Sequence, residues 1–250
     1  MPGVLSLSIP YFYLIHLLVV GFRVGAALLF APIWGHQAFP QYLRILLVFS
    51  VAFVIANVTP WSEAAYLNPG TVLPTEFLIG LLLSVGIRIA FAGLHFGGHL
   101  ISYHLGFSTI QTIDPTTANR STLISGFLTM FGYALILATN QHHVILRALA
   151  ESYRAFPVGS VVQPGQWFER LFAAGGQIFA IGWKIALPVF IATSLIEVTA
   201  AFLARMQPQM STMVVTAPLK VFIGIFVLGA TLVFLPRAFG SVIEVIVLRK

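Results

Sequence analysis

The sequence predicts an all-α, polytopic membrane protein built from broken, kinked helices and helical hairpins. Of its 250 residues, 58% are hydrophobic and only 8% are charged, whereas a soluble domain carries about 25% charged residues. The mean hydropathy of +0.96 points to the same conclusion. Proline, glycine and charged residues interrupt the apolar stretches, and a simple membrane anchor needs none of them.

Six apolar blocks follow one another along the chain, and a membrane-spanning helix requires ~20 residues. The first block ends at Pro32 and Gly35, and the second lies between Pro40 and Pro60. Turn-rich linkers at 59–71 and 151–166 precede the third and fifth blocks. The expected blocks are Tyr11–Ala31, Tyr42–Val58, Leu73–Leu105, Leu123–Leu149, Phe168–Ala204 and Met213–Leu248.

The third, fifth and sixth blocks are too long or contain proline, so we expect helix breaks inside them. The third block has 33 residues. As a straight helix these would measure roughly 50 Å, against a hydrocarbon core of about 30 Å. Proline removes a backbone donor and clashes with the preceding turn. The expected breaks are at Gly97, Pro188, Pro218 and Pro236.

The composition also limits partners and chemistry. Cysteine is absent, which excludes disulfides, thiolate metal sites and cysteine nucleophiles. The net charge is +6, but the basic residues are scattered singly, so we expect no nucleic-acid partner. Basic residues at the ends of apolar spans usually face anionic membrane lipids. No basic residue precedes Arg23, so we do not expect a cleaved signal peptide.

Several charged residues lie inside or close to the apolar blocks. Each charge costs about 2.5–3.5 kcal/mol at mid-bilayer and needs compensation. One interpretation is an ion or proton relay in a secondary transporter, with Glu197 after Pro188 as its carboxylate. The other is pairing between helices or subunits, which the residues favour. The charged residues are Arg23, Glu76, Arg88, Lys184, Glu197 and Lys220.

Histidines occur as two pairs, His95 with His99 and His142 with His143. Four imidazoles could ligate haem, copper or zinc, but their spacing fixes no coordination geometry. We therefore favour roles in hydrogen bonding and helix capping and assign no metal site. The sequence contains no Ser-His-Asp constellation, phosphate-binding loop or paired catalytic carboxylates. A conduit or assembly component is therefore favoured over an enzyme, and no catalytic residue is assigned.

The stretch from Gly106 to Ser121 is unusual because it is too polar for a lipid-facing span and too apolar for a solvated loop. It carries no charge before Asp114, and Pro115 then favours a turn. Such a segment can line or block a pore. An ordinary surface loop with a few buried anchors explains these residues equally well.

Several stretches, in order along nearly the whole chain, resemble the FliR/SctT family of type III secretion export-gate proteins. Asn140-Gln141-His142-His143 stands where the family usually has Asn-Gly-His-His, and Ser211 stands in place of Asn. The flagellar FliR branch is favoured over the injectisome branch, which stays an alternative beside a stand-alone proton-coupled transporter. The matching stretches are Phe22–Gly35, Glu76–Arg88, Gly106–Pro115, Thr139–His143, Ser152–Gly159, Lys184–Val189, Ala204–Ser211 and Ala217–Lys220.

The resemblance implies one integral-membrane domain over residues 1–250 that acts as a single-copy subunit of a helical hetero-oligomer. Its partners would be several copies each of FliP and FliQ, together with FlhB. Residues 1–165 would pack like FliP and residues 166–250 like a FliQ hairpin. The assembly would export unfolded flagellar proteins through the bacterial inner membrane, within the flagellar basal body. It implies no reaction and no cofactor for this chain.

The resemblance also assigns roles to particular residues. The stretch after the third block would plug the pore, with Gly106 as its bend and Phe107 and Ile110 as apolar stoppers. The charged residues inside the blocks would pair with neighbouring subunits. The remaining members of the expected plug are Ile113, Asp114, Pro115 and Arg120.

Overall fold

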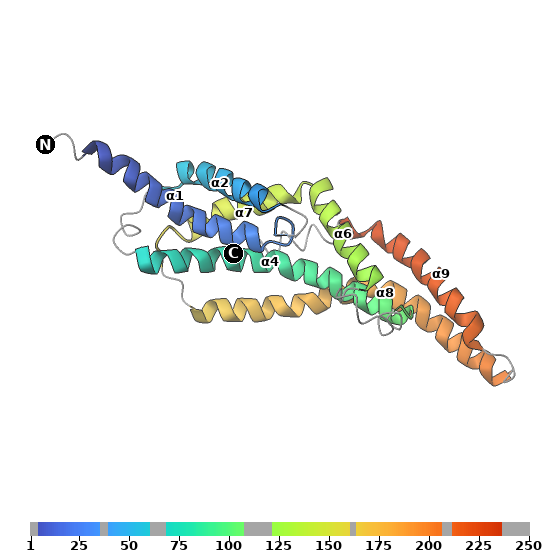
Figure 1. Ribbon diagram of the computed structural model, residues 1–250. Helices are drawn as coiled ribbons and strands as arrows, with labels where there is room; N and C mark the ends of the chain where they lie inside the picture. Colours follow the sequence, from blue (N-terminus) through green and yellow to red (C-terminus); the bar gives the residue numbers. More distant parts are fainter. Residues whose placement is uncertain are drawn as a thin grey trace. The chain divides into compact units, whose positions relative to one another are not determined.

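The computed structural model describes residues 5–35, 40–60, 69–107, 122–160, 164–206 and 212–236. Within these ranges the secondary structure is seven α-helices and no strand, so the expected all-α fold is confirmed (Figure 1). Five of the described helices are long and apolar enough to cross a membrane, and the described part of the chain has six such spans if α6 and α7 together count as one broken span. The helices are α1 (Leu5–Phe30), α2 (Gln41–Val58), α4 (Pro69–His104), α6 (Leu123–Ala138), α7 (Gln141–Ala155), α8 (Pro164–Met206) and α9 (Thr212–Leu232).

Three of the four helix breaks that the sequence predicted do not occur. Helix α4 continues through Gly97, α8 through Pro188 and α9 through Pro218, while Pro236 lies beyond the end of α9. A proline removes only one backbone hydrogen bond from a long helix, and in apolar helices neighbouring groups can compensate for that loss. Gly97, Pro188 and Pro218 are therefore inside continuous helices, and the expected breaks there are wrong. For Pro236, which follows the end of α9, the expected break stays a prediction.

The fourth apolar block, predicted as one stretch, is divided in two. Helix α6 ends at Ala138 and α7 begins at Gln141, and Asn140 between them has a φ of 57°. Asparagine is one of the few residues that adopt this left-handed conformation readily. The Thr139 backbone N–H donates to the Leu135 carbonyl over 2.8 Å and closes the last turn of α6.

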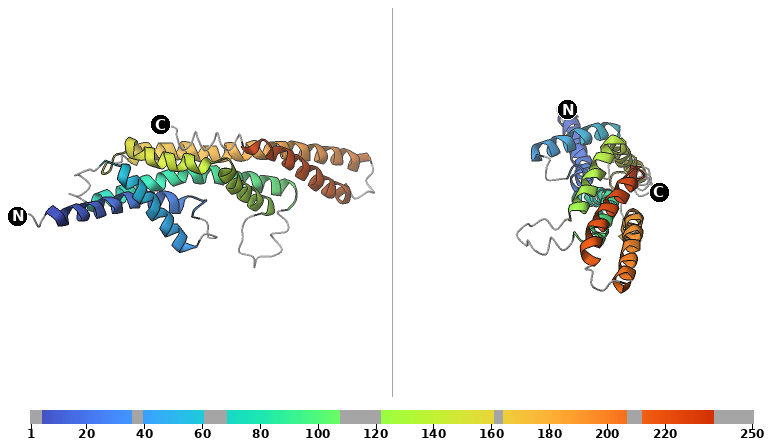
Figure 2. Two further views of the ribbon diagram at one scale, coloured as in Figure 1. Left: turned by 90° about the horizontal axis from the view of Figure 1, so that it is seen from above. Right: turned by 90° about the vertical axis from the view of Figure 1, so that its right-hand side faces the viewer.

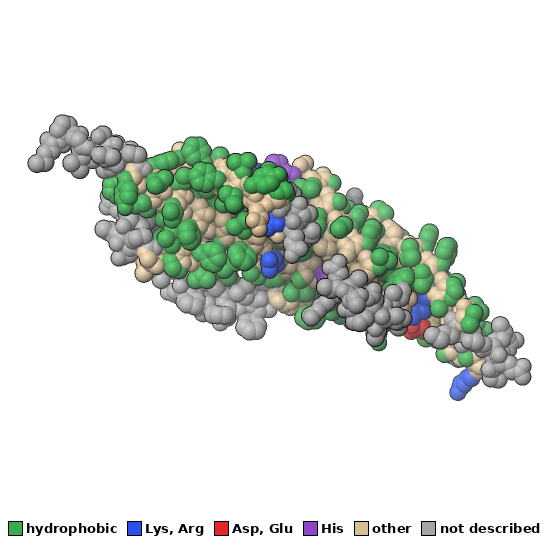
Figure 3. Space-filling model, in the orientation of Figure 1, with side chains coloured by type: hydrophobic (Ala, Val, Ile, Leu, Met, Phe, Trp, Pro, Cys, Tyr) green, Lys and Arg blue, Asp and Glu red, His purple; other side chains and the backbone are tan. Residues whose placement is uncertain are grey.

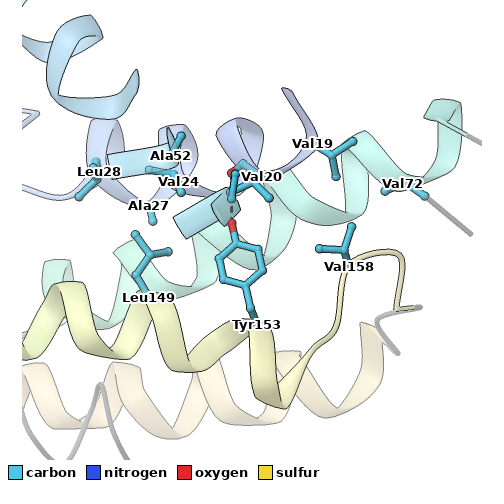
Figure 4. Packing of buried hydrophobic residues seen from close by; sticks show 11 residues of the cluster. Val19, Val20, Val24, Ala27, Leu28, Ala52, Val72, Leu149, Tyr153 and Val158 are labelled. Atoms are coloured by element: carbon cyan, nitrogen blue, oxygen red, sulfur yellow. Dashed lines mark hydrogen bonds between the residues drawn. The ribbon is translucent and has the colours of Figure 1, made fainter. Parts of the chain in front are cut away.

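The chain divides into two compact units, and the first contains Met1–Arg88, Asn140–Leu171 and Ile243–Lys250. Its described core joins α1, α2, the first part of α4, and α7 with the turn that follows it (Figure 4). Small and β-branched side chains let these helices approach closely. The core residues are Val19, Val20, Val24, Ala27, Leu28, Ala52, Ala56, Val72, Leu149, Tyr153 and Val158.

The second unit contains Ile89–Thr139 and Phe172–Val242. Glycines of α4 form its closest helix contacts. A Cβ on Gly97 would lie 3.0 Å from the Gly182 carbonyl oxygen of α8, and a Cβ on Gly98 would lie 2.4 Å from the Ser125 Cα of α6. Gly97, where a break was expected, and its neighbour Gly98 instead let three helix backbones pack together.

Within the second unit, α9 runs antiparallel beside the C-terminal part of α8 (Figure 1, Figure 2). Large apolar side chains of this hairpin, including Leu195, Phe202, Phe222 and Phe226, are exposed. Hydrophobic side chains also dominate the face of the molecule in Figure 3. Such surfaces require lipid or protein cover. The division into a FliP-like portion to residue 165 and a FliQ-like remainder stays a prediction.

Candidate functional site

An ion pair lies fully buried in the first unit. The Arg23 Nε of α1 donates to the Glu76 Oε2 of α4 over 2.6 Å, and neither side chain is exposed. Gly80 follows Glu76 by one turn and permits the close approach of the two helices. A Cβ at Gly80 would lie 2.3 Å from the Arg23 carbonyl oxygen.

Further hydrogen bonds to the pair come from α7 and the turn after it. Arg23 Nη1 donates to Ser152 Oγ over 3.3 Å, and Nη2 donates to the Phe156 carbonyl over 2.9 Å. The Gly159 N–H donates to Glu76 Oε1 over 3.2 Å. A buried ion pair is favourable only when hydrogen bonds satisfy its remaining groups, and this network meets that requirement.

Tyr153 completes the surroundings of the guanidinium. The Arg23 Cζ lies 4.0 Å from the centroid of the Tyr153 ring, a cation–π distance. The Tyr153 hydroxyl donates to the Val20 carbonyl over 3.1 Å, and Figure 4 shows the side chain reaching from α7 toward α1. The aromatic ring therefore holds α7 against the same turn of α1 that carries Arg23.

The network has a structural role, because it joins segments far apart in sequence. It fixes the turn at 156–160, where Gly159 has a φ of +83° and the Ser160 N–H donates to the Pro157 carbonyl over 3.0 Å. Arg23 and Glu76 are predicted from the sequence as charges that need a partner, but not as partners of each other. Ser152, Tyr153 and Gly159 were not predicted, and their only signal in the sequence is the matching stretch Ser152–Gly159.

A second ion pair lies in the hairpin of the second unit. Lys220 Nζ of α9 donates to Glu197 Oε1 of α8. The Glu197 side chain is 53% exposed and the Lys220 side chain is 19% exposed. This pair joins the two arms of the hairpin, and Glu197 also has an open side.

The two other charged residues expected in an inter-subunit network differ from each other. Arg88 Nε donates over 2.6 Å to the carbonyl of Phe30, the last residue of α1, and so caps that helix. Lys184 is exposed on α8. The predicted inter-subunit pairing is therefore corrected for Arg23 and Glu76, which pair with each other inside the chain. For Arg88, Lys184, Glu197 and Lys220, whose side chains are exposed or partly exposed, it stays a prediction.

The start of the expected plug lies at the end of α4. Gly106 has a φ of +83°, its N–H donates to the Tyr103 carbonyl, and the Phe107 N–H donates to the Ser102 carbonyl. This pattern is a Schellman C-cap, in which glycine is preferred. Phe107 is the last described residue here. The other expected plug residues, Ile110, Ile113, Asp114, Pro115 and Arg120, lie outside the described ranges.

The two ends of the segment between α4 and α6 are joined by side chains that the sequence analysis did not identify. Ser102 Oγ donates to Thr122 Oγ1 over 2.7 Å, and both residues are buried. Thr122 is also the N-cap of α6, because its hydroxyl oxygen accepts the Ser125 N–H. The chain therefore leaves α4 and enters α6 at neighbouring points.

The histidine pairs form ring contacts rather than a larger cluster. The ring centroids of His95 and His99 are 4.5 Å apart, and those of His142 and His143 are 4.2 Å apart. The His104 ring meets Phe190 edge-on at 4.5 Å. Over the described part of the chain, no three His, Asp or Glu side chains group closely enough to hold a metal ion.

Known proteins resemble this chain over most of its length. The family model for bacterial export proteins, family 1, matches residues 14–246. The flagellar biosynthetic protein FliR of Aquifex aeolicus is 30% identical over 223 residues, covering 86% of this chain and 84% of the relative. The FliR proteins of Caulobacter vibrioides and Escherichia coli are 28% and 26% identical, and the aligned regions cover 84% and 83% of this chain and 85% and 80% of those proteins. The sequence, the helical architecture and these matches together show that the chain belongs to the family of bacterial export proteins.

Proposed function

We propose that this chain is a subunit of the flagellar type III export gate in the bacterial inner membrane. One copy would assemble with several copies of FliP and FliQ, beside FlhB, into the pore for unfolded flagellar proteins. The observation that carries the proposal is the family match from residue 14 to residue 246. The relatives cited above are named flagellar biosynthetic proteins and align over most of their own length.

The distribution of charge and apolar surface supports an assembly component. Arg23 and Glu76 neutralise each other inside the chain. The outer faces of α2, α8 and α9 carry many exposed apolar side chains, such as Phe49, Ile191 and Phe226. Apolar surface of this kind is stable when lipids or other subunits cover it. The proposal assigns the chain no reaction and no cofactor.

The proposal includes a pore plug from Gly106 to Arg120. The Gly106 cap ends α4, and the Ser102–Thr122 hydrogen bond joins the segment's two ends. A segment whose ends are held together can project from its helices without pulling them apart. In the proposed gate, Phe107 and Ile110 are the apolar stoppers of the closed state.

Deletion of the gene in its own bacterium tests the export proposal. The expected result is loss of swimming and of secreted flagellin, both restored by the wild-type gene on a plasmid. Tagged protein, expressed with its genomic neighbours and solubilised, should have the mass of one copy bound to several copies of two other small membrane proteins. Normal secretion after deletion, or a folded lone monomer, contradicts the proposal.

Removal of residues 107–114 tests the plug separately. The shortened chain should still assemble, while ion leakage across the inner membrane rises because the closed pore loses its apolar stoppers. The control replaces the same residues with a Gly-Ser segment of equal length, which separates the effect of side-chain chemistry from that of length. Unchanged conductance in both variants contradicts the plug but leaves the export proposal standing.

A further inference from the structure

An apolar groove lies between the C-terminal end of α1 and the N-terminal half of α2, within the first unit. Its volume is about 430 Å³, and eight of its ten lining residues are apolar. This volume lies in the range typical of ligand pockets, about 300–1,000 Å³. The Ser50 hydroxyl, one of the two polar groups in the lining, donates to the Leu46 carbonyl of its own helix over 2.8 Å. Among the lining residues that the structure describes, Arg44 is the one charged residue.

The groove can be reached from outside the protein. Its floor includes Leu28, which is fully buried, while Leu29 and Leu43 at its edges are exposed and Leu46 is 63% exposed. Helix α2 contributes only Ala52 and Ala56 to the buried core. The groove therefore continues onto the apolar outer face of a helix that is long and hydrophobic enough to span a membrane.

The charged end of the groove coincides with the ends of two candidate spans. Helix α1 ends at Phe30, α2 begins at Gln41, and the lining residues Trp34 and Arg44 lie at these ends. Arg88 brings a second cation to the same end, through its bond to the Phe30 carbonyl. Tryptophan and arginine gather where a span meets the headgroup layer, and none of the described residues that line the groove is acidic.

We propose that this groove binds an anionic phospholipid. One acyl chain fills the apolar part against Leu28 and Leu46, and the phosphate lies on the Arg44 guanidinium. Arginine presents a planar fork that holds phosphate oxygens through two hydrogen bonds. A zwitterionic headgroup brings its own cation, whereas an anionic headgroup leaves a net negative charge for Arg44 and Arg88. Phosphatidylglycerol should therefore bind in preference to phosphatidylcholine.

Native mass spectrometry of the protein, with the subunits that co-purify with it, tests this site. The protein is placed in nanodiscs of equal phosphatidylglycerol and phosphatidylcholine, and the retained lipids are counted. Arg44→Gln should lower phosphatidylglycerol retention about tenfold, as expected for loss of a charge-assisted bond, and Arg44→Lys less. The control Arg147→Gln, which removes an exposed arginine of α7, should retain the lipid as the wild type does.

A second pair of variants tests the apolar part of the groove. Leu46→Asp places a carboxylate in its wall and should abolish phosphatidylglycerol retention. Ile45→Asp adds the same charge at a neighbouring residue that is 66% exposed and does not line the groove, so it should have little effect. Equal retention of the two lipids, retention unchanged by Arg44→Gln, absence of retained lipid, or full displacement by inorganic phosphate would each overturn the proposal.

Discussion

At the scale of single residues, the guanidinium of Arg23 is fully buried, and a buried charge is costly unless an opposite charge and hydrogen bonds compensate it. It is stable because Glu76 supplies the opposite charge while Ser152 and Phe156 accept its other hydrogen bonds. Removing one partner of such a pair leaves an uncompensated charge, which costs far more than the intact pair contributes.

Glu76→Gln should therefore destabilise the protein strongly. The amide cannot neutralise Arg23, and it cannot accept from both Arg23 Nε and the Gly159 N–H. We expect a loss of about 3–5 kcal/mol in the free energy of unfolding, measured by denaturation in mild detergent. Glu151→Gln, at an exposed site of α7, should change it by less than about 0.5 kcal/mol.

The double variant Arg23→Leu with Glu76→Leu provides an internal check on that prediction. Two apolar side chains leave no buried charge, so the double variant should be more stable than Glu76→Gln alone. A Glu76→Gln protein as stable as the wild type would contradict the assigned role of the pair.

This pair also shows what the sequence could predict at the residue scale. A charge inside an apolar block must be compensated, so the sequence identifies Arg23 and Glu76 as residues with a partner. It does not identify the partner, because the two lie in helices whose packing depends on side chains along their whole length. The turn at 156–160 contributes a backbone carbonyl and a backbone N–H to the network. Almost every residue type carries these groups, so the sequence does not reveal their role.

At the scale of elements, glycine has two opposite roles: it can end a helix, as Gly106 does, or let a second helix approach inside a continuous one. Glycine in the third block predicted a break, but Gly97 and Gly98 lie at helix contacts inside continuous α4. The real interruption is at Asn140, in a polar run that the sequence analysis associated with histidine chemistry. The all-α class and the approximate helix bounds follow from hydropathy, whereas packing decides whether glycine ends a helix or lets another approach.

Gly98→Ala tests the contact between α4 and α6. The added methyl group would lie 2.4 Å from the Ser125 Cα. Because this is a backbone atom, the clash can be relieved only by shifting helix α6. We expect a loss of about 1–3 kcal/mol in unfolding free energy, as for other overpacked sites. The matched control is Gly126→Ala on α6, where no atom lies within 4 Å of an added Cβ, and it should be neutral or stabilising by up to about 1 kcal/mol. Equal effects of the two changes would contradict a packing role for Gly98.

Gly106→Ala tests the end of α4. No atom lies within 4 Å of an added Cβ at Gly106, so the whole effect comes from its φ of +83°. The left-handed conformation costs a residue with a side chain roughly 1–2 kcal/mol, and thermal denaturation should show a loss of this size. Gly70→Ala, also with open space and without a positive φ, should show no loss. A stable Gly106→Ala protein would mean that this C-cap does not hold the end of α4 in place.

At the scale of the whole molecule, charge is used sparingly, and two ion pairs form within the described part of the chain, while apolar side chains remain exposed on several helices. Folding of this single chain therefore leaves surface that lipid or other subunits must cover. Hydropathy alone cannot separate these two kinds of cover, since both are apolar. Charges that remain accessible are the better guide to contacts between subunits.

Charge reversal in the α8–α9 hairpin tests whether its ion pair acts within the chain or between chains. Glu197→Lys places two cations side by side and should loosen the hairpin, lowering the yield of the assembled complex in size-exclusion chromatography. Glu197→Lys with Lys220→Glu restores opposite charges, so assembly should recover if the pair is internal. If the double variant stays unassembled, Glu197, which is half exposed, also meets a cation of another subunit. Lys184→Glu is the control on the same helix, because it reverses an exposed charge that is not part of the ion pair. It should change assembly only if Lys184 contacts another subunit.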